Sequence, residues 1–382
     1  MDLAMRELGD RIRSRMPEGM SQRGLAELVG MKPDALSRAL NGQRGISSLE
    51  VAAIADVIGA DTHWIITGRE VPNRVTIAAR HAWNPTTRQR INDGREADAA
   101  VLDKIAEVYR QAFPDGAEPS AALPTDPAEA RDRLGPGFVE PFAERLESRL
   151  GVDVIRIPGL STDYSLRIGD RAVIVLMSTP NWFRNNWSAA HELAHLAFGH
   201  HGDDSETVGR NEDVSDAFAA ELLLPESDMR SIVWREMPLP DVARQIWSRG
   251  VSTSALATRL TWLKLADRDL IDALRSTTTP QFLRAHLEEA RTDRFLIRRR
   301  GERSVGRLFP EELLGVLEER VAAGDVAPDL LAWAQDVDTE EIDYPDDETY
   351  EALAASRYQA AIADRPSLAE LRAIAAEIRA RE

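Results

Sequence analysis

The sequence of 382 residues contains no cysteine. This absence excludes disulfide frameworks, thiolate zinc fingers, iron–sulfur ligation and cysteine nucleophiles. A metal site in this chain must therefore use histidine and carboxylate ligands. With 43% apolar and 29% charged residues, the chain is long enough for two or three domains that each bury a core.

Long apolar runs are also missing. No stretch approaches the roughly 20 apolar residues of a membrane span. The first residues, Met1-Asp2-Leu3, lack the charged and then apolar plan of a signal peptide. We therefore expect a soluble, cytoplasmic protein with no membrane partner.

Basic charge is scarce, and the net charge is −17. That average argues against nucleic-acid binding, because phosphate contacts need a basic footprint. The charge is uneven, however: residues 1–70 hold 9 Lys/Arg and 10 Asp/Glu, whereas the rest of the chain holds 38 and 54. The N-terminal segment is close to neutral, so its basic side chains can still gather on one face.

The apolar spacing predicts a mostly α-helical protein with a small β-sheet. We expect strands only at 152–157 and in a hairpin of 164–168 and 172–177, turned by Gly169-Asp170. The clearest boundary is a proline-rich stretch before residue 125. The predicted divisions are a helical domain (1–70), a helical connector with a proline-rich linker (71–124), an α+β domain (125–235), a helix-turn-helix-like extension (236–265) and an acidic helical region of unassigned role (266–382).

The most informative motif is His191-Glu192-Leu193-Ala194-His195. On a helix, the two histidines lie one turn apart on one face and can bind one zinc ion. Glu192 is then placed to act on the water at that ion as a general base. Gly199 is expected to end this helix, because glycine favours the left-handed C-cap.

A catalytic zinc site needs a third protein ligand and an open fourth position. His201 has the third-ligand spacing of the metzincin pattern, but Phe198 stands where that pattern has glycine. Glu212, on the next predicted helix, is the other candidate, and we favour it. Only this choice gives a role to Asp216, which falls one turn later and can accept the free ring N–H of a ligand histidine.

The paired motifs form a thermolysin-like layout and resemble the ImmA/IrrE family of metallopeptidases. The run that carries the resemblance comprises Arg184, Trp187, residues 190–196, Glu212, Asp216 and residues 218–225. The resemblance implies a zincin-like, gluzincin-type α+β domain and a zinc-dependent metallo-endopeptidase. The stretch 246–265 also resembles the segment C-terminal to the peptidase core in that family. Ser215 and Trp187 depart from the family's frequent Ala and Phe.

Residues 21–42 predict a helix-turn-helix, with Gly30 at the turn and Pro33 opening the second helix. This segment resembles the Xre-type repressor DNA-binding domain, over residues 5–68. Away from the predicted core lie the candidate base and phosphate contacts Lys32, Ser37, Arg38 and Asn41, flanked by the candidate backbone contacts Gln22 and Arg44. A small helical domain that binds only protein is the alternative.

Together these features predict a DNA-binding regulator that is also a zinc peptidase. By resemblance, its protein substrate would be a transcriptional repressor or antitoxin, cleaved in a stress or phage-induction response. The basic excess around the helix-turn-helix is small, so binding to duplex DNA by one monomer should be weak. Proteins with such folds usually bind DNA as homodimers, and we expect the same here. The alternative is a helix-turn-helix regulator or antitoxin whose metal site is structural or sensory and does not turn over.

Overall fold

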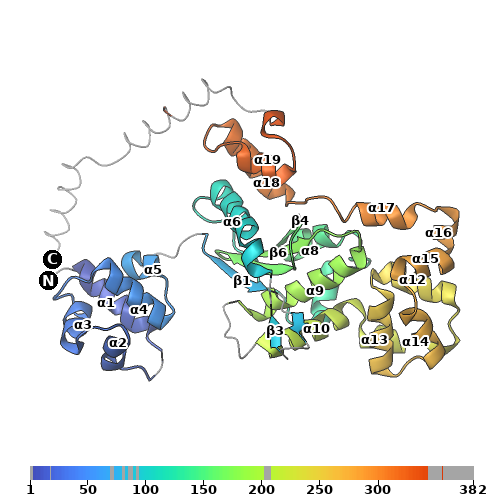
Figure 1. Cartoon of the computed structure of the whole chain (residues 1–382), viewed down its shortest axis with the longest axis horizontal. Helices are drawn as coiled ribbons and strands as arrows, with labels where there is room; N and C mark the ends of the chain where they lie inside the picture. The colour runs from blue at the N-terminus through green and yellow to red at the C-terminus, as the bar shows by residue number, and fades with distance from the viewer. Residues whose placement is uncertain are drawn as a thin grey trace. The chain divides into compact units, whose positions relative to one another are not determined.

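The computed structural model describes residues 3–17, 19–68, 73–79, 82–84, 89–91, 94–201, 208–342 and 355. The chain divides into two compact units, Met1–Arg74 and Val75–Glu382, which Figure 1 labels by element. The end of the predicted C-terminal helical region lies outside the described residues.

The N-terminal unit is built from short helices around one apolar core. Its described helices are α1 (Leu3–Arg15), α2 (Gln22–Leu28), α3 (Pro33–Leu40), α4 (Ser48–Ile58) and α5 (Thr62–Thr67). Ile12, Leu36 and Ile54 are fully buried between them. Helix α4 begins with a capping box, in which the Ser47 hydroxyl and the Glu50 carboxylate each accept a backbone N–H from the other residue. The described part of this unit is therefore helical and has a core of its own.

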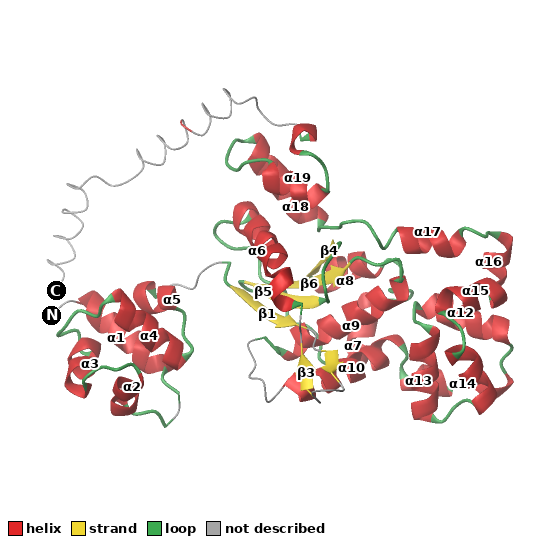
Figure 2. Cartoon of the chain, in the orientation of Figure 1, coloured by secondary structure: helices red, strands yellow, loops and turns green. Residues whose placement is uncertain are grey.

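The second unit combines a small sheet with many helices (Figure 2). Its strands are β1 (Val75–Ala79), β2 (Ala82–Asn84), β3 (Gln89–Ile91), β4 (Val152–Ile157), β5 (Tyr164–Ile168) and β6 (Arg171–Met177). The helices up to the candidate site are α6 (Arg95–Ala112), α7 (Pro127–Leu134), α8 (Phe142–Leu150), α9 (Trp182–Phe198) and α10 (Val208–Leu223). The later helices are α11 (Glu226–Arg230), α12 (Leu239–Arg249), α13 (Thr253–Leu263), α14 (Arg268–Arg275), α15 (Thr279–His286), α16 (Glu288–Thr292), α17 (Leu296–Glu302), α18 (Glu311–Ala322) and α19 (Asp329–Gln335).

The main sheet is mixed and has the strand order β1-β5-β6-β4. Strands β5 and β6 form the antiparallel hairpin predicted from the sequence, with Leu166 opposite Val173. Strand β4 runs parallel to β6, with Val154 opposite Ile174. The predicted fold class, mostly α-helical with a small β-sheet, is confirmed.

Both faces of this sheet are covered, which explains why β4 and β6 are apolar along most of their length. Val154 and Ile174 pack into the cluster that includes α9 and α10, while Ile155 and Val175 pack into a second cluster with α6 and α18. Figure 1 accordingly shows α6, α18 and α19 above the sheet and α9 and α10 below it. The helix that bears the two motif histidines therefore rests on a rigid support.

Two expectations for residues 71–124 are wrong. Residues 75–91 contain strands rather than helix alone, because the β-branched Val75 and Ile77 pack against the second cluster while β1 pairs with β5. The proline-rich stretch is not a linker between domains either. The Ser120 hydroxyl donates to the Gly151 carbonyl (2.6 Å) and accepts the Ala172 N–H (2.9 Å), which ties this stretch to the sheet.

The described helices of the second unit are short or amphipathic. None of the helices within the described ranges is long and apolar enough to cross a membrane.

Candidate functional site

Helix α9 carries the His191–His195 motif and is buried on nearly every side. Ala190, Leu193 and Ala194 are fully buried against its neighbours. The helix ends at Gly199, whose left-handed φ of +69° suits glycine and whose N–H donates to the His195 carbonyl. The two histidines are 0% and 3% exposed, so their imidazoles lie inside the protein.

Helix α10 packs beside α9 and brings Glu212, which is 2% exposed, to the two imidazoles. The Nε2 atom of His191 lies 3.1 Å from Nε2 of His195 and 3.3 Å from the Glu212 carboxylate. The Nε2 atom of His195 lies 3.8 Å from the other Glu212 oxygen. Two imidazoles and one carboxylate thus converge, with one donor atom of each residue within 4.8 Å of the others, and among the described residues this is a group that can hold a metal ion.

Asp216 lies one turn after Glu212, as the sequence spacing predicts. One of its carboxylate oxygens is 2.9 Å from Nδ1 of His191. A carboxylate at this position accepts the Nδ1–H, which leaves the lone pair of Nε2 directed at the other donor atoms. The His191 ring is therefore oriented from both of its nitrogens.

His200 is a neighbour of the site that the sequence analysis missed. Its Nδ1 atom lies 3.1 Å from Nδ1 of His195. Its ring stacks on Phe198 with a centroid distance of 5.6 Å and an interplanar angle of 13°. The signal in the sequence is its spacing of five residues from His195, just beyond the helix-ending Gly199. His201, the alternative third ligand, is not part of the converging group.

Burial keeps His195 in the neutral form, which is the form that binds metal ions. Desolvation, followed by the positive charge that His191 can carry, lowers the pKa of His195 from 6.5 to about 3. A neutral imidazole offers a lone pair, whereas a protonated one does not. His195 is thus neutral at physiological pH.

A buried aspartate anchors α9 to the hairpin and was also missed. Asp163, 1% exposed, accepts hydrogen bonds from the Ser188 hydroxyl (2.7 Å) and the Met177 N–H (2.8 Å). Ser188 lies one turn before His191 on α9, so the Asp163 carboxylate anchors this helix next to the His191–His195 motif. Glu192, on the same helix, is 0% exposed.

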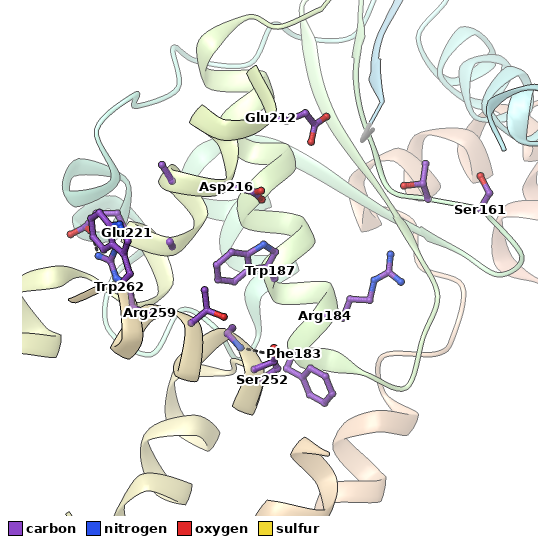
Figure 3. Close-up of a pocket in the computed structure, with 16 residues that line it drawn as sticks. Ser161, Phe183, Arg184, Trp187, Glu212, Asp216, Glu221, Ser252, Arg259 and Trp262 are labelled. Atoms are coloured by element: carbon purple, nitrogen blue, oxygen red, sulfur yellow. Dashed lines mark hydrogen bonds and ion pairs between the residues drawn. The ribbon is translucent and has the colours of Figure 1, made fainter. Parts of the chain in front are cut away.

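A groove of about 1230 Å³ opens beside these residues. Glu212 and Asp216 line it at one end, while Trp187 and Trp262 line it further along (Figure 3). The converging group is therefore buried but borders a space large enough for a polypeptide segment.

In the N-terminal unit, α2 and α3 form the predicted helix-turn-helix. The Ser21 hydroxyl caps α2 by accepting the Gly24 N–H at 3.1 Å. Gly30 adopts a left-handed φ of +68° at the turn, and Pro33 occupies the start of α3. Leu25 and Leu36 close the core between the two helices.

The six candidate DNA contacts fall into two groups. Gln22, Lys32 and Arg38 are exposed, and Ser37 is half-buried on α3. The other two, of which Asn41 is exposed and Arg44 half-buried, have side-chain partners within the domain. The side-chain carbonyl of Asn41 accepts a hydrogen bond from the Arg13 guanidinium (2.7 Å), and Arg44 pairs with Glu50 (2.6 Å).

Comparison with protein families agrees with both halves of this description. Residues 147–261 match the family model described as the IrrE N-terminal-like domain, of peptidase M78, and residues 7–63 match a model described as a helix-turn-helix domain. Searches of curated proteins and of solved structures each found no match. The suspected architecture is thereby confirmed: the chain carries an N-terminal helix-turn-helix domain followed by an IrrE N-terminal-like domain of the peptidase M78 type.

Proposed function

We propose that this protein is a DNA-binding regulator and a zinc-dependent metallo-endopeptidase. Its N-terminal domain binds duplex DNA, as a homodimer, and its second unit hydrolyses a peptide bond in a transcriptional repressor or antitoxin. The cleavage belongs to a stress or phage-induction response in the cytoplasm. The match of residues 147–261 to a peptidase domain and of residues 7–63 to a helix-turn-helix domain supports both parts.

The observation that carries the proposal is the convergence of His191, His195 and Glu212. A tetrahedral zinc ion with bonds of about 2.1 Å holds its ligand atoms roughly 3.4 Å apart. Here the two Nε2 atoms are 3.1 Å apart, one Glu212 oxygen lies 3.3 Å from Nε2 of His191 and the other lies 3.8 Å from Nε2 of His195, so the donor set fits zinc. Two imidazoles and one carboxylate leave a fourth position open, as hydrolytic zinc sites do.

Both histidines have a polar partner on the ring nitrogen that faces away from this point. Asp216 accepts from Nδ1 of His191, and His200 is placed to accept from Nδ1 of His195. Such partners fix the tautomer and the ring orientation of metal-binding histidines. They support a site that is built to hold an ion.

When bound here, zinc would supply Lewis-acid activation of a water molecule and of the scissile carbonyl. Glu192 follows the first ligand on the same buried helix, and we assign it the proton transfers. It takes a proton from the attacking water as the new carbon–oxygen bond forms. It then gives that proton to the amine nitrogen as the carbon–nitrogen bond breaks.

The DNA-binding half of the proposal rests on the surface of α3. Lys32 and Arg38 are exposed at the start and in the last turn of this helix. A second helix of a helix-turn-helix enters the major groove with such residues. Two copies related by two-fold symmetry would then contact a palindromic site.

Replacing Glu192 by glutamine tests the peptidase proposal. Glutamine keeps the shape of the side chain but cannot take up the proton, so zinc content and DNA binding should stay while cleavage is lost. The measurement is the level of a co-expressed candidate repressor in cells, with the exposed Glu236→Gln as the matched control. Wild type and Glu236→Gln should deplete the repressor, and Glu192→Gln should not.

If the Glu192→Gln variant depletes the repressor as the wild type does, the peptidase proposal is wrong. The protein would then be a regulator or antitoxin whose metal site is structural or sensory.

A further inference from the structure

The groove beside the converging group runs along three helices of the second unit. On α9 it is lined by Phe183, Arg184 and Trp187, and on α10 by a row that starts at Glu212. Helix α13 supplies another side, including Trp262, and Ser161 and Thr162, just before β5, also line the groove. Figure 3 shows Glu212 and Asp216 at one end of this space and Trp262 at another, with Trp187 between them. The groove is thus continuous with the candidate metal site.

The length of the groove is set by the helices that line it. From Glu212 to Glu221, both of which line it, α10 advances by roughly 13 Å at about 1.5 Å per residue. An extended peptide covers that distance in about four residues at about 3.3 Å each. A chain whose peptide bond lies at Glu212 therefore reaches the neighbourhood of Glu221 and Trp262 about four residues away.

The walls of the far end are fixed before any ligand binds. The Arg259 guanidinium donates to the Leu224 carbonyl (2.9 Å) and pairs with Glu221. These bonds tie α13 to the C-terminal end of α10. A wall held in this way needs no reordering when a partner binds, which favours affinity.

Trp262 is the feature that identifies the chemistry of the occupant. Trp262 is 67% exposed, and eight of the other lining positions carry small or hydroxyl side chains. The Arg259 guanidinium lies 5.0 Å from its ring. An indole held against a cation and left open to water gains apolar contact when a bulky side chain covers it.

The burial of the converging group and of its neighbour Glu192 limits the conformation that a bound substrate can adopt. Glu192 and His195 are 0% and 3% exposed. A folded helix about 10–12 Å across cannot bring a backbone carbonyl to such a point, whereas a single extended strand can.

We propose that the groove binds an extended, unfolded segment of the protein substrate, and that a bulky apolar side chain about four residues from the cleaved bond packs on Trp262. This inference rests on the proposed peptidase function and specifies its substrate class. The substrate is then a protein with an exposed, unstructured segment that carries an aromatic or large aliphatic residue.

The test measures binding and cleavage separately. Binding uses full-length, zinc-loaded Glu192→Gln protein and labelled unstructured 12-residue peptides that differ only in a single Phe or Ala. We expect the Phe peptide to bind about tenfold more tightly, because burying an aromatic side chain has at least that effect. Trp262→Ala should remove this preference, while Val233→Ala, at an equally exposed position outside the groove, should keep it.

Cleavage uses the same peptides with the protein carrying Glu192, and mass spectrometry locates the cut. A cut about four residues from Phe, lost together with the binding preference in Trp262→Ala, supports the inference. Equal binding of Phe and Ala peptides, no effect of Trp262→Ala, or tighter binding of helix-forming peptides overturns it. Binding with the expected preference but no cleavage would contradict the proposed function and leave the groove assignment standing.

Discussion

The two candidate sites are held in opposite ways. The converging residues of the second unit are buried, and each imidazole has a polar partner on its far nitrogen. On α3, by contrast, Lys32 and Arg38 lie on the surface and are positioned only by the helix that carries them. A metal site must be preformed because its ligands leave water on folding, whereas a nucleic-acid surface can stay hydrated until DNA arrives.

Two glutamates show the same contrast in their ionisation. In the N-terminal unit, hydrogen bonding to the Ser47 backbone, followed by Arg44, lowers the pKa of Glu50. In the second unit, burial raises the pKa of Glu147 from 4.5 to about 7, against the lowering effect of the Val154 N–H. Both residues are glutamates, so their surroundings decide whether the pKa rises or falls.

The largest effect is expected from a substitution that removes a side chain of the buried site. Glu212→Ala should weaken zinc binding by at least about 100-fold. Even the loss of a residue that only hydrogen-bonds to a metal ligand lowers metal affinity by about 10–100-fold. Competition with a chromophoric chelator measures the affinity. His201→Ala is the matched control and should keep the metal. Zinc loss in the His201 variant and zinc retention in the Glu212 variant would show that His201 is the third ligand, as in the metzincin pattern.

A smaller effect is expected at the exposed surface. Arg38→Ala should weaken binding to the preferred DNA site by ~1–3 kcal/mol if this side chain reads a base, with less effect on other DNA. Arg44→Ala should do less, because Arg44 is paired with Glu50 within the domain. Titrations of each variant with a DNA duplex selected from a random pool measure the binding affinity. An equal loss on all sequences would make Arg38 a phosphate contact.

The smallest effect concerns the stability of the second unit. Between pH 4.5 and about 7 the unfolded Glu147 is ionised while the folded one stays protonated, so the free energy of unfolding falls as the pH rises through this window. Glu147→Gln removes that decline and keeps an acceptor for the Val154 N–H. Since the side chain is partly accessible to water, we expect a gain of about 1 kcal/mol at pH 8 and almost none at pH 4.

Chemical denaturation followed by tryptophan fluorescence at both pH values measures this difference. An equal gain at pH 4 and pH 8 would show that the charge of Glu147 is not its cause.

Local patterns in the sequence were sufficient for the helices and for the β5–β6 hairpin. The spacing from His191 to His195 and from Glu212 to Asp216 also predicted which side chains meet, because both spacings are single turns of helix. Partners that depend on tertiary packing were not predictable in this way. His200 lies beyond a helix end, and Asp163 reaches Ser188 from a different element.

The errors have the same origin. Strand β1 is an edge strand whose partner lies far along the chain, so its short sequence gives little indication of a sheet. The proline-rich stretch looked like a linker because the hydrogen bonds that tie Ser120 to the sheet go to groups far along the chain, at Gly151, Asp170 and Ala172. The hydrogen bond from Arg13 to Asn41 was not predictable either, because Arg13 belongs to another helix, and the role of Asn41 at DNA stays a prediction.

The arrangement of α9 and α10 also bears on how the protein folds. His191 and Asp216, which hydrogen-bond to each other, are only 25 residues apart, whereas β1 pairs Val75 with Ile168. Closing the shorter loop costs about 1 kcal/mol less chain entropy than closing the longer one. When the full-length chain folds, the α9–α10 hairpin can therefore form its contacts before the sheet receives strand β1.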